Sequence, residues 1–221
     1  SEMDAQEEII NFIKEKFSPT AIILHGSRAR GLSRSDSDWD LILLTSEEQS
    51  EKTGRIFKFG HNIEYSFSTL PISSVLTEFG QKLQSAQILY EANDEATEIL
   101  KKAKRGYEEG VHWDVSKIAG HKLWLEGRIS GMIANIDSPQ LFYKYFADCY
   151  TRLYNYWYWL LHEEYSQPLY VAITEIQQRD PDYADLLKTA ADSTQGTTLR
   201  IDAITQIKEK IRERELFINP K

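Results

Sequence analysis

Hydrophobic positions follow two different periods along the chain, and the change of period divides it in two. Before about residue 92, short apolar runs rich in strand-forming residues alternate with polar segments that contain glycine and proline. From about residue 94 onward, apolar residues recur at steps of three or four. A strand buries alternate residues and a helix every third or fourth. The pattern therefore predicts an α/β (α+β) domain at residues 1–92 and an all-α helical bundle at residues 93–221.

The first part is predicted to begin with a helix and to continue with strands. Asp4 and Glu7 have the spacing of a capping box, and apolar residues at helical steps extend to Phe17. Gly60-His61 separates two strand-like runs, which predicts a hairpin, and Pro71 suits the first turn of a further helix. The predicted strands, which would form a small mixed sheet, cover residues 21–25, 39–44, 55–59 and 62–67.

The second part contains an aromatic-rich segment, in a helix predicted at residues 139–162. It carries more rings than one stripe of a helix can bury. A helix buried on several sides or at a dimer interface is the favoured explanation, and an acceptor pocket is the alternative. Whether the protein forms a homodimer stays open. The rings belong to Phe142, Tyr143, Tyr145, Phe146, Tyr150, Tyr154, Tyr156, Trp157, Tyr158, Trp159 and Tyr165.

Two carboxylates at the start of a predicted strand are the first candidate functional residues. Asp38 and Asp40 are two positions apart, so the alternation of a strand places them on one face. Mg²⁺ in proteins takes one or two carboxylates and completes its shell with water and substrate phosphate. The pair therefore predicts a magnesium site.

A polar turn between the first two predicted strands is the second candidate. Gly26 follows the first strand directly, and a glycine lets backbone N–H groups approach phosphate oxygens. Ser27, with Arg28 or Arg30, adds donors where the charge of a triphosphate would lie. The turn is therefore predicted to bind phosphate.

The segment from Gly26 to Leu41, GSRARGLSRSDSDWDL, closely resembles the signature of the polymerase-beta-like nucleotidyltransferase superfamily. The resemblance is closest to its small prokaryotic members, which carry Gly-Ser-x-Ala-Arg-Gly. It implies that Gly26 and Ser27 hold the β- and γ-phosphates of a nucleoside triphosphate. It also implies that Asp38 and Asp40 bind two Mg²⁺ ions, whereas Asp36 lies outside the pair.

The family needs a third carboxylate on a neighbouring strand, and Glu64 is the candidate. It lies in a strand-like run, on the face opposite Ile63 and Tyr65. Glu64 would complete the metal site and serve as general base, unless that base is Glu163 or Glu164 of the helical part. The alternative for Glu64 is a charge that protects a sheet edge from aggregation.

The net charge narrows the class of acceptor molecule that the chain is expected to bind. A formal net charge of −8 and a pI near 5.2 argue against nucleic acid, because affinity for it depends on clustered Lys and Arg. A neutral or cationic small molecule fits better.

No apolar stretch reaches the roughly 20 residues that span a bilayer, and the single cysteine, Cys149, has no internal disulfide partner. A cytoplasmic location without a membrane is expected.

The order of the two parts is similar to that of the aminoglycoside nucleotidyltransferases, which are antibiotic-modifying enzymes. The resemblance implies magnesium-dependent transfer of a nucleoside monophosphate, expected to be AMP, from a nucleoside triphosphate to a hydroxyl of a small molecule, with an aminoglycoside as one candidate. Two alternatives stay open. One is a toxin–antitoxin or regulatory nucleotidyltransferase that modifies a protein or tRNA, and the other is a catalytically silent nucleotide-binding homologue.

Overall fold

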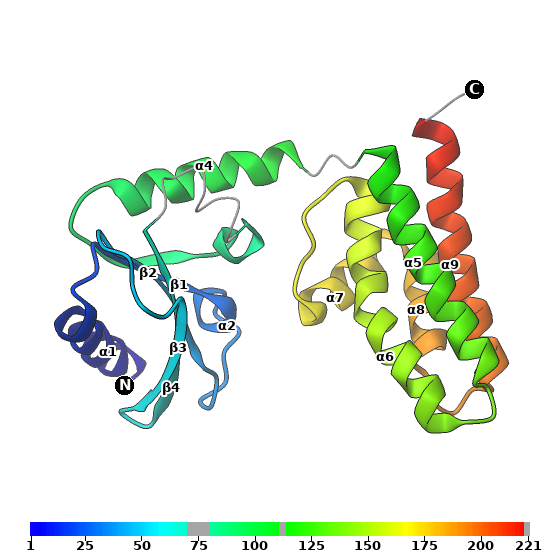
Figure 1. Cartoon of the computed structure of the whole chain (residues 1–221), viewed down its shortest axis with the longest axis horizontal. Coiled ribbons are helices and arrows are strands. Elements are labelled where there is room, and N and C mark those ends of the chain that lie inside the picture. Colours follow the sequence, from blue (N-terminus) through cyan, green and yellow to red (C-terminus); the bar gives the residue numbers. More distant parts are fainter. Residues whose placement is uncertain (70–79, 111–113, 219–221) are drawn as a thin grey trace. The chain divides into compact units, whose positions relative to one another are not determined.

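The chain folds into two compact units, Ser1–Glu109 and Gly110–Lys221. The structure, a computed structural model, describes residues 1–69, 80–110 and 114–218 (Figure 1). The boundary expected from the sequence lies at residues 92/93, and helix α4 (Glu95–Glu109) accounts for the difference. Ala96, Ile99 and Ala103 of α4 are buried in one hydrophobic cluster with residues of the sheet, so the helix belongs to the first unit.

The first unit is built on a mixed sheet, as expected, with five strands where four were predicted. The strand order is β3-β4-β2-β1-β5, and within the described residues only the β2–β4 pair is parallel. Strand β5 was not predicted, because its apolar run, Ile88 to Tyr90, is short and lies at a sheet edge. The strands are β1 (Ala21–His25), β2 (Trp39–Leu44), β3 (Thr53–Lys58), β4 (His61–Ser68) and β5 (Gln87–Glu91).

Helices cover the two faces of the sheet unequally. On one face, Ile9 and Ile13 of α1 (Glu2–Phe17) pack in a cluster that includes residues of β1, β2 and β4. On the other face, the cluster under α4 contains residues of β1, β2 and β5 but, among the described residues, none of β3 or β4. This second face of β4 carries Glu64 and Ser66, since both alternate with the buried Ile63 and Tyr65. Among the described residues, the hydrophobic cluster on that face thus stops short of its β3–β4 half.

Two local predictions were wrong by a few residues. The capping box of α1 joins Ser1 and Asp4, one turn before the predicted one, because Ser1-x-x-Asp4 has the spacing for a cap as well and lengthens the helix. The hairpin between β3 and β4 turns at Phe59-Gly60, where both φ angles are positive, so that His61 already belongs to β4. The helix predicted to begin at Pro71 lies outside the described residues.

The second unit is helical, as expected. The aromatic-rich segment forms α6 and a π-helical turn, and six of its rings are buried in the core: Phe142, Phe146, Tyr154, Tyr156, Trp157 and Tyr158. Cys149 is buried among them, and burial raises the pKa of its thiol to about 12. The elements are α5 (Val115–Ala134), α6 (Pro139–Tyr156), η2 (Trp157–His162), α7 (Leu169–Arg179), α8 (Pro181–Ala191) and α9 (Thr197–Ile218). Within the described ranges, every helix is too short or too polar to cross a membrane.

Candidate active site

The turn after β1 is held against the second strand by a glycine. Gly26 begins the short helix α2 (Gly26–Ala29) with a φ of 76°, a conformation that other residues rarely adopt. A Cβ at this position would overlap the carboxylate of Asp40. Glycine is therefore required twice, once by the backbone and once by the close approach to Asp40. Ser27 follows it in α2, so the predicted phosphate turn and the predicted carboxylate are adjacent.

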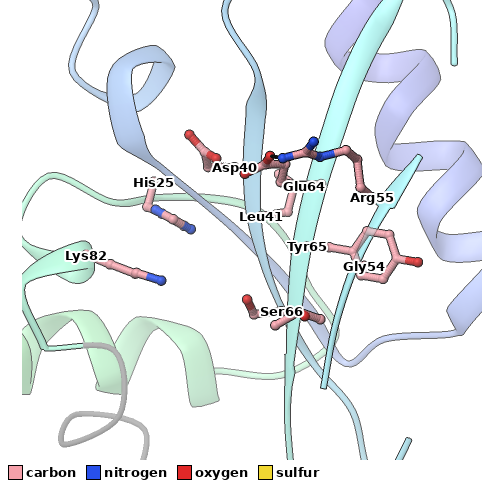
Figure 2. Close-up of a pocket in the computed structure, with 10 residues that line it drawn as sticks. His25, Asp40, Leu41, Gly54, Arg55, Glu64, Tyr65, Ser66 and Lys82 are labelled. Carbon is pink, nitrogen blue, oxygen red and sulfur yellow. Dashed lines mark hydrogen bonds and ion pairs between the residues drawn. The ribbon is translucent and has the colours of Figure 1, made fainter. Parts of the chain in front are cut away.

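Four side chains form a row across the sheet. His25 of β1 is the register partner of Asp40 in β2, Asp40 is the partner of Glu64 in β4, and Glu64 is the partner of Arg55 in β3. Residues in direct register project from the same face of a sheet. Asp40 and Glu64, two of the three candidate metal ligands, therefore lie on one face, and Figure 2 shows their carboxylates near each other.

The row borders a cavity of about 570 Å³. Its lining combines the four residues of the row with polar groups from β3, β4 and the 3₁₀ helix η1 (Gly80–Leu83). Lys82 of η1 lies at one side of this cavity (Figure 2). The lining residues are His25, Asp40, Leu41, Thr53, Gly54, Arg55, Glu64, Tyr65, Ser66 and Lys82.

Negative charge gathers around Asp40. Its pKa is raised above the ordinary value, first by burial and then by the neighbouring Glu64 and Asp38 carboxylates. The positive charges of Lys82 and Arg30 act in the opposite direction. Asp40 and Glu64 line the cavity, Asp38 lies close enough to act on Asp40, and carboxylate oxygens suit a hard divalent cation. The residues present therefore fit Mg²⁺.

The three carboxylates do not converge on one point. Asp38 accepts a hydrogen bond from the Asn62 amide at 2.9 Å, and Glu64 is ion-paired with Arg55. Accordingly, the described residues contain no group of three His, Cys, Asp or Glu side chains arranged to hold a metal ion. A cation held by Glu64 together with Asp38 and Asp40 would compete with Arg55 for Glu64 Oε1.

Arg28 lies apart from the carboxylates. Its guanidinium donates to the Ser37 carbonyl oxygen at 2.7 and 3.1 Å, pairs with Glu2 at 2.9 Å and stacks on Trp39. The side chain is only 4% exposed. Arg28 thus holds the loop that carries Asp38, whereas phosphate binding was expected of it.

Arg30 lies nearer the site than Arg28. Its charge acts on both Asp40 and His25, and its buried Nε has no hydrogen-bond partner in the described part of the chain. Of the two predicted arginines, Arg30 is the one within electrostatic reach of the carboxylates.

The sequence interpretation did not include three basic residues that line the cavity, His25, Arg55 and Lys82. Burial, reinforced by the charges of Lys82 and Arg30, lowers the pKa of His25 to about 4, so its imidazole is neutral at pH 7. The alternation of β1 gives a signal for His25, because it places this residue on the face of Ile23. Arg55 and Lys82 give no such signal, since each reaches the cavity only through the strand register or the fold.

The two candidates for a general base in the helical unit, Glu163 and Glu164, have surroundings different from those of Glu64. Glu164 accepts two hydrogen bonds from Arg179, at 2.6 and 2.9 Å, and Glu163 occupies the left-handed position that ends η2. Arg179 also binds Glu175 at 2.8 Å. The Glu164 carboxylate therefore links the end of η2 to α7.

The comparisons with known proteins agree with this geometry. Residues 7–104 match the family model described as Polymerase beta, Nucleotidyltransferase, a range that includes the Gly26 turn, the Asp38–Asp40 pair and Glu64. A solved structure of a nucleotidyltransferase-like protein from Exiguobacterium sibiricum 255-15 is similar at a TM-score of 0.54 and 14% identity. That similarity covers 96% of this chain and 76% of that one, and at this identity it shows the fold. No curated protein matches. The first unit is thus a domain similar to the polymerase beta nucleotidyltransferase family.

Proposed function

We propose that this protein is a magnesium-dependent nucleotidyltransferase that moves a nucleoside monophosphate, AMP in the first instance, from a nucleoside triphosphate to a hydroxyl of a small molecule. One observation carries the proposal: the Gly26 turn abuts Asp40, whose neighbour across the sheet is Glu64, at a cavity of about 570 Å³. A phosphate-binding turn beside paired carboxylates is what nucleotidyl transfer requires.

Asp38, Asp40 and Glu64 would hold the magnesium. The bound metal would neutralise phosphate charge and polarise the phosphorus that is attacked. The Ser27 hydroxyl and the backbone N–H groups of its turn would bind the terminal phosphates. Lys82 and Arg30, whose charges already act on Asp40, would add positive charge beside the triphosphate.

Glu64 would move the proton. In the transfer, the acceptor oxygen forms a bond to the α-phosphorus, the bond from that phosphorus to the bridging oxygen breaks, and pyrophosphate leaves. The acceptor hydroxyl loses its proton in this step, and we assign that proton to the Glu64 carboxylate. Glu64 is chosen because it lines the cavity, and its pairing with Arg55 is matched by that of Glu164 with Arg179.

The cavity and the charge of the chain favour a neutral or cationic acceptor. Thr53 and Ser66, which are register partners on the face of Glu64, contribute hydroxyl-bearing residue types to its lining, and these suit a polyhydroxylated molecule. The net charge of −8 disfavours nucleic acid and suits a cation. Aminoglycosides combine hydroxyls with positive charge, so they are the acceptor class that we propose to screen first.

Calorimetric titration tests the donor site. ATP, GTP, CTP and UTP with Mg²⁺ would be titrated into the wild type, Asp38→Ala/Asp40→Ala and the control Asp36→Ala. Asp36 lies in the same loop but is exposed and paired with Arg34, so its removal should leave binding intact. We expect metal-dependent binding that only the double variant loses. A folded wild type that binds none of the four triphosphates would contradict the proposal.

A further inference from the structure

One ion pair occupies a carboxylate that the proposed metal site needs. Arg55 of the edge strand β3 pairs with Glu64 of β4, and the two are register partners (Figure 2). On its other side, Glu64 is the register partner of Asp40. Glu64 therefore lies between a guanidinium and the carboxylate with which it would share a cation.

Glu64 differs in this respect from the other two carboxylates. Asp38 is bonded to the neutral amide of Asn62, and in the part of the chain that the structure describes neither Asp38 nor Asp40 forms an ion pair. A carboxylate oxygen that accepts a hydrogen bond from a guanidinium cannot give the same lone pair to a metal ion. A cation that uses Glu64 Oε1 must therefore displace Arg55, and a cation on Glu64 Oε2 would lie beside the positive guanidinium.

The surroundings of Arg55 permit that displacement. Its side chain is 69% exposed, while that of Glu64 is 34% exposed. Among the residues that the structure describes, no strand lies beyond β3 in the order of the sheet, so Arg55 belongs to an edge strand. Arg55 also lines the cavity in which the triphosphate would bind. An arginine released from Glu64 at this place would meet phosphate oxygens, for which its planar group is well suited.

We propose that Arg55 is a displaceable counter-ion of Glu64 that couples metal binding to nucleotide binding. Without ligands it neutralises Glu64 and lowers the affinity of the site for a bare cation. With both ligands present it leaves Glu64 and binds the triphosphate. The coupling is reciprocal, so each ligand strengthens the binding of the other through the same side chain. This inference rests on the proposed function.

The first arm of the test measures metal binding without nucleotide. Mn²⁺ would be titrated against the wild type, Arg55→Met, Lys58→Met and Asp40→Asn, with free Mn²⁺ followed by electron paramagnetic resonance. Lys58 lies on the same strand but, by alternation, on the opposite face, over Phe12, so its variant removes the same charge away from Glu64. We expect Arg55→Met to bind Mn²⁺ about two- to fivefold more tightly than wild type. Lys58→Met should be unchanged.

The second arm adds a non-hydrolysable ATP analogue. The wild type should gain more Mn²⁺ affinity from the analogue than Arg55→Met does, because only the wild type has the arginine to transfer. Circular dichroism melts would establish that all variants are folded. Equal Mn²⁺ affinity of the wild type and Arg55→Met would overturn the inference while leaving the proposed function intact. Mn²⁺ binding that survives Asp40→Asn unchanged would overturn both.

Discussion

Asp40 and Glu64 are direct neighbours on β2 and β4, the one parallel pair of strands in the sheet. Strand β3 lies between β2 and β4 in the sequence, but in the sheet it lies at the edge and pairs antiparallel with β4. This order lets β4 run beside β2. This topology places Glu64 next to Asp40. Gly26, which directly follows β1, lies against the Asp40 carboxylate. The predictions below follow from that arrangement.

Replacing Gly26 should damage both the fold and the site. Gly26→Ala puts a methyl group into the space of the Asp40 carboxylate and a side chain on a residue with a φ of 76°. We expect a loss of roughly 1–3 kcal/mol in the free energy of unfolding, measured in urea, and weaker Mn²⁺ binding. Gly31→Ala is the matched control, because Gly31 has a φ of 69° but nothing within 4 Å of its Cβ position. If both variants bind Mn²⁺ equally, the contact with Asp40 has no importance for the site.

Arg28 should prove to be a structural residue. Lysine cannot reproduce its forked bonds to the Ser37 and Ser35 carbonyls or its stacking on Trp39. We expect Arg28→Lys to lower the free energy of unfolding by about 1–3 kcal/mol. The control, Arg34→Lys, changes an exposed arginine of the same loop and should cost less than about 0.5 kcal/mol. A stable Arg28→Lys variant with weakened triphosphate binding would instead return Arg28 to the phosphate site.

The ion pair of Glu164 with Arg179 should make the helical unit sensitive to acid. Hydrogen bonds from Arg179 lower the pKa of Glu164 below its ordinary value of 4.5. A carboxyl group whose pKa is lower in the folded state stabilises that state above the unfolded pKa, and this contribution disappears as the pH falls through the folded pKa. The wild type should therefore exceed Glu164→Gln in melting temperature at pH 7, and the difference should shrink below about pH 4.5. Asp185→Asn, which also removes one carboxylate, at an exposed position of α8, is the control.

The sequence carried most of the information about the site. Gly26, Ser27, Asp38 and Asp40 are close in the chain, so spacing and alternation alone predict that they meet. Glu64 was proposed because the resemblance to the polymerase-beta-like superfamily implies a third carboxylate on a neighbouring strand, and Glu64 is an acidic residue in an otherwise apolar run. By contrast, the Arg55–Glu64 pair depends on the hairpin register, and the turn at Phe59-Gly60 shifts that hairpin by one residue from the prediction.

Other features depend on tertiary packing. The partners of Arg28 come from the loop around Ser35 and Ser37 and from Glu2 of α1, and no periodicity indicates which of two neighbouring arginines turns inward. Lys82 reaches the cavity from η1 and His25 from the end of β1, and only the folded sheet brings them together. In the helical unit, the stripe of apolar residues predicted α6, but not that its last turn would be π-helical.

Label transfer tests the central claim most directly. ATP labelled at the α-phosphate or, separately, at the γ-phosphate would be incubated with Mg²⁺, a panel of aminoglycosides and other polyhydroxylated acceptors, and either the wild type or Asp40→Asn. The account predicts that the α-label moves to an acceptor, that the γ-label leaves as pyrophosphate, and that Asp40→Asn slows transfer by at least about a hundredfold. Transfer of the γ-label to the acceptor, or α-label transfer that Asp40→Asn leaves unchanged, would contradict it.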